Sequence, residues 1–434
     1  MTSIAEWPTY KTNKNSGVEK IGHIPDFWEV NKLKFVTSIN SETLPENTSS
    51  SLPLDYVDIG SVSFENGIEK TERYVFKDAP SRARRRARSG DVVISTVRTY
   101  LKAMACVDDD ASRYTYSTGF AVITPKKDLI STFLGYFVKS NAFTEQVDMV
   151  AKGMSYPAIN SSELSNLYLV LPPVEDQILI AKFLDKTVEQ IDEAIMLKKK
   201  QIERLKERKQ IIVQQAVSKG LDPNVAMKDS GIDWIGRIPN HWTVKKAKYL
   251  FNEVDERSVA GEEELLSVSH ITGVTPRSEK NVSMFMAEDY SGSKLCKKND
   301  LVINIMWAWM GALGVSNQTG IVSPSYGVYR QKRKNLFNPV YLEYLLKTTK
   351  YIEYYNKVST GLHSSRLRFY GHMFFAMKLG FPDFDEQNSI VSYLEEKTTK
   401  IDQALAVQNS QIDKLKEYKA TLIHNAVTGK IKVA

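Results

Sequence analysis

The sequence predicts an α+β protein built from two similar halves, each a mixed globular domain followed by a long helix. Three observations predict this class: a turn-rich segment that occurs twice, a long heptad pattern that also occurs twice, and mixed strand and helix patterns between them. The 434 residues are too many for one ordinary core and indicate two to three domains. Hydrophobic residues make up 42% and charged residues 25%, as in ordinary soluble globular proteins.

The repeat has two sets of landmarks. GVEKIGHIPDFWEV at residues 17–30 returns as GIDWIGRIPNHWTV at residues 231–244, at an offset of 214. LPPVEDQ at residues 171–177 returns as FPDFDEQ at residues 381–387, at an offset of 210. The middles of the two halves differ much more than these landmarks. A shared frame around unlike middles indicates one scaffold that presents two different surfaces.

Each half ends in a helical pattern whose apolar residues recur in alternating steps of three and four. The first stripe runs from Ala181 to Ala216, and adding 210 to every position gives the second stripe, from Val391 to Ala426. The polar breaks in the stripes also match, Lys198 with Gln408 and Lys209 with Lys419. A narrow stripe is buried best against another narrow stripe, so we expect the two helices to pair as a coiled coil. Packing of each helix on its own domain is the alternative.

The middle of each half predicts strands and helices in the same order. GDVVISTV at residues 90–97 and NDLVINIM at residues 299–306 are expected to be corresponding strands. FLGYFVKSNAF at residues 133–143 and YLEYLLKTTKY at residues 341–351 are expected to be corresponding amphipathic helices. Each middle is therefore predicted to be an α+β domain. The predicted divisions of the chain are 1–173 (first domain), 174–219 (first helix), 220–382 (second domain) and 383–434 (second helix).

Motifs for catalysis are missing from the sequence. It contains no GxxxxGK[ST] phosphate loop, HExxH, GxSxG elbow, or GxGxxG after a strand, and no NPPF- or DPPY-type tetrapeptide of the kind found in amino-methyltransferases. The six histidines have no metal-ligand spacing, and Cys106 and Cys296 are too far apart in sequence to form a zinc motif. We therefore expect a binding protein with no metal or cofactor of its own.

Signals for binding a polyanion are stronger. The formal net charge is +7, and RARRRAR at residues 82–88 places five arginines in seven positions. The arginine fork suits phosphate and guanine. Trp307 and Trp309 alternate, which predicts that they share one strand face, although core packing would explain them too.

The segments KGMSYPAI (residues 152–159) and TGLHSSRLRF (residues 360–369) combine glycine, small polar and basic residues, which suits a loop that approaches phosphate closely; an ordinary surface loop is the alternative. The candidate DNA-binding residues are Arg82, Arg84, Arg85, Arg86, Arg88, Arg98, Tyr100, Lys102, Lys152, Ser155, Tyr156, Lys294, Lys298, Trp307, Trp309, Arg330, Ser365, Arg366 and Arg368.

Targeting and membrane signals are not recognisable in the sequence. The first residues show no basic region followed by an apolar one. The longest apolar run, at residues 301–315, is too short to span a bilayer. We expect a cytoplasmic protein without a membrane partner.

Taken together, these features resemble the specificity subunit of type I restriction–modification systems over nearly the whole chain. The resemblance rests on the doubled IGxIPxxW segment, the block RARRRARSGDVVISTVRTYLKA, the segments NDLVINIMWAWMGALGVS and GIVSPSYGVYR, and the doubled helix start P-x-x-[ED]-[ED]-Q. It implies that each middle is a target-recognition domain reading one half of a bipartite, gapped sequence in double-stranded DNA. It also implies an antiparallel coiled coil of the two long helices, pseudo-twofold symmetry, and docking of two methyltransferase subunits on the helices.

The resemblance further implies that the chain is not an enzyme. S-adenosylmethionine would belong to methyltransferase partners that modify adenine N6. ATP and Mg²⁺ would belong to motor–nuclease partners, up to two of which can join the complex. The sequence departs from the family at Tyr156, where members often carry glutamine before the proline. The resemblance therefore gives the position of this loop and no individual contact.

Two other functions remain as hypotheses. A coiled-coil scaffold that pairs proteins without touching DNA would explain the helices and the repeat, but not the arginine cluster or the unlike middles. A self-sufficient nuclease or methyltransferase would show activity as the purified chain, with metal or with S-adenosylmethionine alone.

Overall fold

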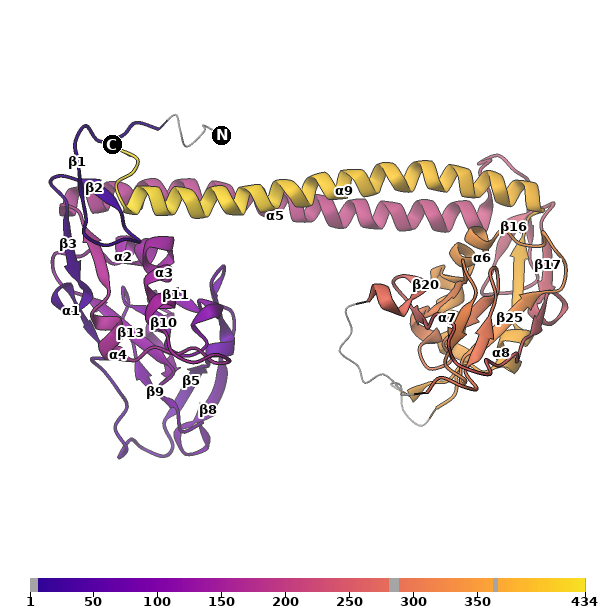
Figure 1. The fold of residues 1–434 in the computed structure, drawn as a ribbon, viewed down its shortest axis with the longest axis horizontal. Helices are drawn as coiled ribbons and strands as arrows, with labels where there is room; N and C mark the ends of the chain where they lie inside the picture. Colours follow the sequence, from indigo (N-terminus) through magenta and orange to yellow (C-terminus); the bar gives the residue numbers. More distant parts are fainter. Residues whose placement is uncertain (1–6, 281–288, 362–365, 434) are drawn as a thin grey trace. The chain divides into compact units, whose positions relative to one another are not determined.

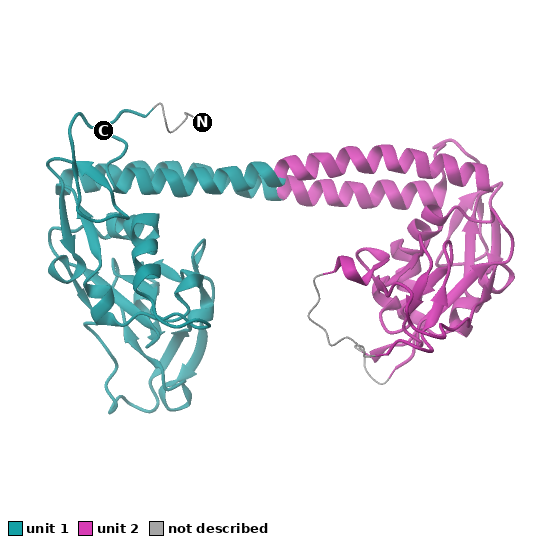
Figure 2. Ribbon diagram, viewed as in Figure 1, with its two compact units in different colours: residues 1–199, 409–434 teal, residues 200–408 magenta. Residues whose placement is uncertain are grey.

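The structure is a computed structural model that describes residues 7–280, 289–361 and 366–433. The chain divides into two compact units, residues 1–199 with 409–434 and residues 200–408 (Figure 2). Each unit contains one α+β domain, the beginning of one long helix and the end of the other (Figure 1). The predicted α+β class, with two domains joined by two long helices, is confirmed.

The first unit is built around a four-stranded central sheet of order β11-β10-β13-β4. Its middle strands are buried almost throughout, and α2 packs against β10 and β11. The strands of this sheet are β4 (Thr37–Ile39), β10 (Val92–Ser95), β11 (Met104–Cys106) and β13 (Phe120–Pro125). A second four-stranded sheet, β8-β5-β12-β9, contains β5 (Pro53–Val57), β8 (Glu72–Val75), β9 (Ala83–Arg86) and β12 (Thr115–Ser117).

Short elements complete the first unit. Its short strands are β1 (Asn13–Asn15), β2 (His23–Pro25), β3 (Glu29–Lys32), β6 (Val62–Ser63), β7 (Gly67–Ile68) and β14 (Tyr168–Leu171). Its short helices are α1 (Leu33–Val36), α2 (Ser131–Lys139), α3 (Asn141–Val150) and α4 (Ser161–Ser165). Helices α2 and α3 together replace the single amphipathic helix predicted for residues 133–143, because the chain breaks at Ser140, whose backbone is extended.

The central sheet of the second unit repeats the topology of the central sheet of the first. The second unit has the strand order β18-β25-β22-β23 in this sheet, which matches β4-β13-β10-β11 in the first. Its strands are β15 (Met227–Asp229), β16 (Arg237–Pro239), β17 (Thr243–Lys246), β18 (Phe251–Glu253), β19 (Leu266–Ser269), β20 (Gly273–Pro276), β21 (Lys294–Cys296), β22 (Leu301–Ile303), β23 (Leu313–Val315), β24 (Gly320–Val322), β25 (Gly327–Gln331) and β26 (Lys378–Phe381). Its short helices are α6 (Pro339–Leu346), α7 (Thr349–Val358) and α8 (Gly371–Ala376).

The long helices are α5 (Val174–Lys219) and α9 (Phe384–Val427). Every position of the two predicted stripes is buried or half-buried, which accounts for the heptad pattern. In the first unit Lys419 Nζ donates to the carboxylate of Asp192 at 2.6 and 2.7 Å, and Lys198 Nζ donates to Gln411 Oε1 at 2.5 Å. Positions rise along α5 as they fall along α9, so the predicted antiparallel pairing is confirmed.

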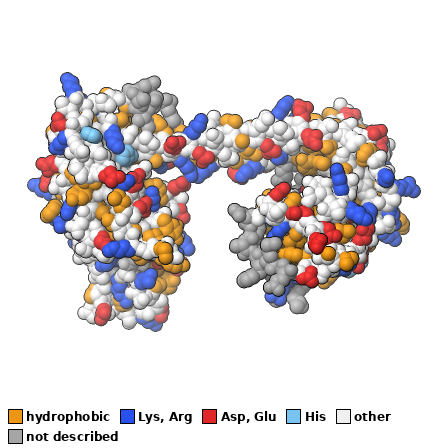
Figure 3. Space-filling view, viewed as in Figure 1, with side chains coloured by type: hydrophobic (Ala, Val, Ile, Leu, Met, Phe, Trp, Pro, Cys, Tyr) orange, Lys and Arg blue, Asp and Glu red, His pale blue; other side chains and the backbone are white. Residues whose placement is uncertain are grey.

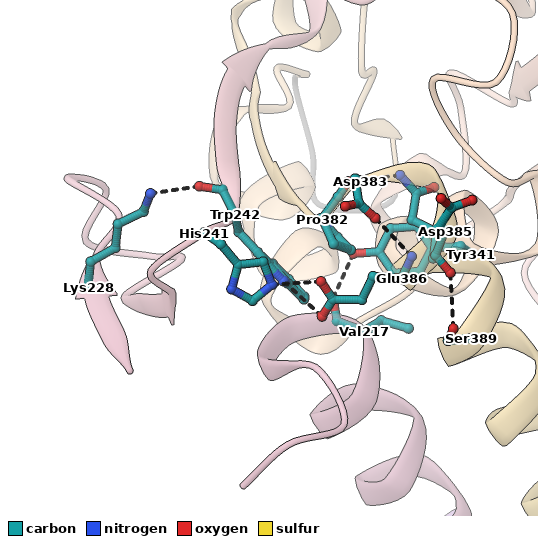
Figure 4. A network of polar contacts seen from close by, with 11 residues as sticks. Val217, Lys228, His241, Trp242, Tyr341, Pro382, Asp383, Asp385, Glu386 and Ser389 are labelled. Carbon is teal, nitrogen blue, oxygen red and sulfur yellow. Dashed lines mark hydrogen bonds and ion pairs between the residues drawn. The ribbon is translucent and has the colours of Figure 1, made fainter. Parts of the chain in front are cut away.

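The repeated tryptophan anchors the start of each long helix. In the second unit Trp242 Nε1 donates to Glu386 Oε1 at 3.2 Å, and His241 Nε2 lies 2.7 Å from Oε2 of the same carboxylate (Figure 4). In the first unit Trp28 Nε1 donates to Asp176 Oδ2 at 3.1 Å. Both indole rings are buried. The tryptophans therefore join each domain to the first turn of its helix, as the repeat predicts for a structural residue.

The glutamine of the doubled helix start is buried and fully hydrogen-bonded. Gln177 Oε1 accepts from the backbone N–H of Ile130 at 2.8 Å, and Nε2 donates to the carbonyls of Asp128 at 3.0 Å and Pro172 at 2.8 Å. Gln387 makes the equivalent bonds in the second unit, which include acceptance from the Asn338 N–H at 2.9 Å. This residue thus ties each long helix to the segment preceding α2 or α6.

Candidate nucleic-acid interface

Two predicted segments of the first unit form a single surface. Residues 96–102 follow β10, and residues 152–159 follow α3; we call them the first loop pair. The Ile159 N–H donates to the Thr96 carbonyl at 2.8 Å, and the Thr99 N–H donates to the Pro157 carbonyl at 3.2 Å. The Arg98 guanidinium lies over the Tyr156 ring, 5.2 Å from its centroid. Backbone pairing therefore unites residues that are distant in sequence.

The first loop pair exposes large side chains on a strained backbone. Tyr156 is 66% exposed and Tyr100 is 55% exposed. Arg98 and Lys102 have positive φ angles of 51° and 48°. Such left-handed conformations cost non-glycine residues about 1–3 kcal/mol, and they cluster at functional sites. An exposed arginine stacked on a tyrosine presents both a donor fork and an aromatic face, which suits phosphate, base edges and unstacked bases.

Other candidates in the first loop pair are partly engaged. Lys102 Nζ donates to Thr144 Oγ1 at 3.4 Å. Lys152 pairs with Glu163 at 2.8 Å, and this hydrogen bond raises the pKa of Lys152. Ser155 is exposed. Two exposed apolar side chains that the sequence analysis missed lie in the same segments, Leu101 and Met154.

The second unit has an equivalent surface, the second loop pair, made of residues 304–311 and the described parts of 360–369. The Phe369 N–H donates to the Ile305 carbonyl at 2.9 Å, as Ile159 does to Thr96. Thr360 and Arg368 exchange backbone hydrogen bonds of 3.1 and 2.8 Å. Arg366 is exposed, and Arg368 Nη1 donates to the Leu367 carbonyl at 3.1 Å. Ser365 lies outside the described residues.

The tryptophans of the second loop pair do not share a strand face, so that prediction was wrong. Strand β22 ends at Ile303, and the chain turns through a 3-10 helix at Ala308–Met310. Asn304 causes the turn, because its side chain accepts from the Met306 N–H at 3.1 Å and its carbonyl accepts from the Trp307 N–H at 3.0 Å. Trp307 stacks on Trp309 with ring centroids 5.7 Å apart and is 47% exposed.

The arginine-rich strand β9 is largely bound by its own domain. The Arg84 guanidinium lies over the Phe76 ring at 4.5 Å. Arg86 Nη1 donates to the carbonyls of Arg113 and Tyr114, both at 3.0 Å. Arg88 forms an ion pair with Glu42. These three arginines therefore hold the second sheet and its flanking turns together.

The remaining arginines of this strand differ from each other. Arg82 is exposed. Arg85 is half-buried, its Nη1 donates to Thr43 Oγ1 at 3.2 Å, and burial lowers its pKa. Arg85 Nε is buried and has no hydrogen-bond partner among the described residues. Arg82 is thus the member of the cluster most open to an external phosphate.

Two basic candidates of the second unit are engaged by their own domain, which the sequence analysis did not anticipate: Lys294 is buried and Arg330 is half-buried. Lys294 is 8% exposed, and its Nζ donates to the Tyr326 carbonyl at 2.9 Å. Arg330 makes a bidentate pair with Asp300 at 2.8 and 2.7 Å and a further bond to Glu256 at 2.8 Å. The hydrogen bond to Asp300 raises the pKa of Arg330. These two residues stabilise the domain, whereas Lys298 is exposed.

A buried acid recurs in the turn after each basic segment and accepts from its backbone. The backbone N–H of Arg88 donates to Asp91 Oδ2 at 2.8 Å, and the N–H of Lys297 donates to Asp300 Oδ2 at 2.8 Å. Burial raises the pKa of Asp91. The repeated Gly90-Asp91 and Asn299-Asp300 turns were the sequence signal for this structural site. This turn therefore belongs to the structural frame that the two units share.

Comparison with known proteins accounts for the repeated architecture. Residues 25–207 match the family model described as a type I restriction modification DNA specificity domain. The protein named as the MjaX type I restriction enzyme specificity subunit of Methanocaldococcus jannaschii is 22% identical, and the alignment covers 95% of this chain and 96% of the relative. Residues 25–207 are therefore similar to this DNA specificity domain, and nearly the whole chain is similar to a type I restriction enzyme specificity subunit.

Further similarities agree with this family. The HindI specificity subunit of Haemophilus influenzae is 30% identical over 135 residues, covering 27% of this chain and 29% of the relative. A solved structure described as part of a type I restriction–modification system matches with a TM-score of 0.72 and 22% identity, covering 93% of this chain and 98% of the other. This match shows that the two chains share a fold.

The described residues contain neither a candidate metal site nor a membrane-spanning helix. No cluster of three or more His, Cys, Asp or Glu residues there could hold a metal ion. No helix there combines the length and apolar character needed to cross a membrane.

Proposed function

We propose that the chain is the non-catalytic subunit that reads the DNA target of a type I restriction–modification complex. The first loop pair would read one half of a bipartite, gapped target, and the second loop pair the other half. One observation carries this proposal: the two units repeat the same backbone frame around these loops, yet present different side chains. The first loop pair presents Arg98 stacked on Tyr156, whereas the second loop pair presents Trp307 and Arg366.

The helix pair supports docking of partner subunits. Leu197 is 50% exposed and Val407 is 54% exposed, and they occupy matching positions of the repeat. Apolar side chains exposed on a paired helix are typical of protein interfaces. We propose that two adenine methyltransferase subunits dock along the helices, and that motor–nuclease subunits join this core. S-adenosylmethionine, ATP and Mg²⁺ would be bound by those partners.

Mapping methylated adenines tests this function directly. The chain is expressed with its methyltransferase partner, and methylation is compared with cells that lack the chain. We expect a gapped two-part motif that depends on the chain. Replacing residues 81–160 with the corresponding segment of another specificity subunit should change one half of the motif and leave the other half and the gap unchanged. A methylome that does not depend on the chain would favour the scaffold hypothesis.

A further inference from the structure

A lysine-rich surface recurs in both units, away from the loop pairs. In the second unit Lys246, Lys248 and Lys332 line an open groove of about 600 Å³, together with His372. The groove lies among β17, β18 and α8, and Glu253 is its acidic member. Basic and acidic side chains are interspersed over the face of each unit drawn in Figure 3, so net charge alone does not locate such a surface.

The lysines of this groove are held in place around an exposed aromatic ring. Lys248 Nζ lies 4.9 Å from the centroid of the Tyr249 ring, and Tyr249 is 61% exposed. Lys332 Nζ donates to the Lys248 carbonyl at 2.7 Å. Lys332 therefore keeps the Lys248–Tyr249 turn in position while its own ammonium group stays exposed. We call Lys246, Lys248, Tyr249 and Lys332 the second lysine patch.

The first unit has the same arrangement. Lys34 Nζ lies 5.3 Å from the centroid of the Phe35 ring, and Phe35 is 63% exposed. Lys126 Nζ donates to the carbonyls of Lys34 at 3.2 Å and Phe35 at 3.1 Å. Lys32, Lys34, Phe35 and Lys126 form the first lysine patch. Each of its members has a counterpart of the same chemical kind in the second patch.

Each patch lies at the opposite end of the central sheet from the loop pair of its unit. Ser95, immediately before the first loop pair, pairs with Phe120 at the start of β13, whereas Lys126 follows the end of β13. A six-residue strand is about 20 Å long at roughly 3.3 Å per residue. In the second unit Ile303 pairs with Gly327 at the start of β25, and Lys332 follows its end.

The recurrence of the lysine patch in both units indicates which kind of partner binds there. The loop pairs differ between units, as expected of surfaces that meet different bases. The lysine patches are alike, so they fit a partner that is the same for both units. Their separation from the loop pairs favours a protein over the duplex held by those loops. Lysine ammonium groups beside an exposed aromatic ring suit carboxylates flanking an apolar anchor.

We propose that each lysine patch binds an acidic segment of a methyltransferase subunit, one copy per unit. This inference rests on the proposed function, because it names the surface through which the recognition domains, in addition to the helices, hold those partners. Charge complementarity would guide association and the exposed ring would be buried at the contact.

Matched variants test the patches one at a time. The first-patch variant carries Lys34→Ala and Phe35→Ala, and the second-patch variant carries Lys248→Ala and Tyr249→Ala. Lys77→Ala and Lys357→Ala are control substitutions of exposed lysines, one in each unit. The purified full chain is titrated with its methyltransferase subunit, and the number of bound copies is measured by native mass spectrometry. Thermal unfolding of each variant checks that it folds.

We expect each patch variant to lose at least tenfold in affinity for one methyltransferase copy, and the combined variant to lose it for both. The controls should bind like the unmodified chain. Normal binding of both copies by a folded combined variant would overturn the inference and leave the proposed function standing. Loss of DNA affinity with unchanged methyltransferase binding would also overturn it and assign the patches to DNA phosphates. An unmodified chain that binds no methyltransferase would overturn both proposals.

Discussion

Single arginine residues divide into two kinds in this protein. Arg84, Arg86 and Arg88 are engaged by a ring, backbone carbonyls and a carboxylate of their own domain. Arg98 instead projects from a left-handed backbone position onto an exposed tyrosine. A guanidinium whose donors are already bonded inside the fold gains little from an external phosphate. Density of arginine in the sequence is therefore a weaker guide to the interface than the partners of each side chain.

Substituting these two kinds of arginine should have different effects. Arg98→Ala should weaken binding of the assembled complex to one half-site, by about 1–3 kcal/mol if it contacts a base edge, and leave thermal stability nearly unchanged. Arg86→Ala should lower the melting temperature instead, because it leaves two backbone carbonyls without their donor. Competition binding with half-site variants and thermal unfolding measure the two effects. Equal loss of affinity for all sequences on Arg98→Ala would make Arg98 a phosphate contact.

One buried histidine predicts a pH dependence of stability. Burial and the nearby Lys430 ammonium group lower the pKa of His424 from 6.5 to about 4. Its Nε2 lies 2.7 Å from Lys430 Nζ, and Nδ1 is buried with no hydrogen-bond partner among the described residues. Because Lys430 can only donate, His424 accepts at Nε2 and is neutral.

The unfolded chain binds a proton at this histidine at a higher pH than the folded chain does. The stability that neutral His424 contributes is therefore complete above about pH 6.5 and is lost as the pH falls toward 4. Urea unfolding should show that the free energy of unfolding falls between pH 7 and 5, and that His424→Gln makes this fall smaller. The exposed His270 offers the matched control, since His270→Gln should leave the loss unchanged. Equal pH profiles for both variants would contradict this account.

At the scale of elements, the helix pair is held by the same ion pair in each unit. Lys419 pairs with Asp192 in the first unit, and Lys209 pairs with Asp402 at 2.6 Å in the second. Adding 210 to Lys209 gives Lys419, and adding 210 to Asp192 gives Asp402. Each lysine occupies a polar break in the stripe and reaches the opposite helix. Polar residues at such positions favour one register over others.

Charge reversal tests the register pairs. Lys209→Glu should lower the free energy of unfolding by about 0.5–1 kcal/mol, because the pair is partly exposed. The double variant Lys209→Glu/Asp402→Lys should recover most of this loss. Lys200→Glu, at an exposed position of the same helix, is the control. Urea unfolding of the unmodified chain, both single variants (Lys209→Glu and Asp402→Lys) and the double variant gives the coupling energy, and a coupling near zero would show that the pair does not stabilise this register.

At the scale of the whole molecule, the chain forms two units, and each unit contains part of both long helices. The first unit takes the start of α5 and the end of α9, and the second unit takes the end of α5 and the start of α9. Each long helix therefore belongs to both units. The net charge of the chain is +7, and only part of its basic residues lie in the two loop pairs.

This distribution predicts the salt dependence of DNA binding. The logarithm of the DNA affinity of the assembled complex should fall linearly with the logarithm of salt concentration, with a slope of about −0.9 for each phosphate neutralised. Arg82→Ala should reduce the magnitude of the slope by about 1 if Arg82 contacts a phosphate. Arg88→Ala should leave the slope unchanged, because Arg88 is paired with Glu42. Binding isotherms at several salt concentrations measure these slopes, and a changed slope for Arg88→Ala would contradict the internal role of Arg88.

The sequence by itself determined the repeat, the class of the domains and the pairing of the helices. These features depend on local periodicity and on landmarks such as Trp28 and Gln177, whose matching positions are visible without coordinates. The heptad stripes also located both long helices to within a few residues, because a coiled-coil seam imposes its spacing directly on the sequence.

Only the tertiary structure decided which basic and aromatic residues are available to a partner. Lys294 and Arg330 are occupied by Tyr326, Asp300 and Glu256, none of which is adjacent to them in sequence. Trp307 and Trp309 stack in a turn, although their alternation fits a strand equally well. Availability depends on non-local hydrogen bonds and burial, whereas composition and spacing report only local preference. For this reason the loop pairs and lysine patches became visible only when strands distant in sequence were brought together.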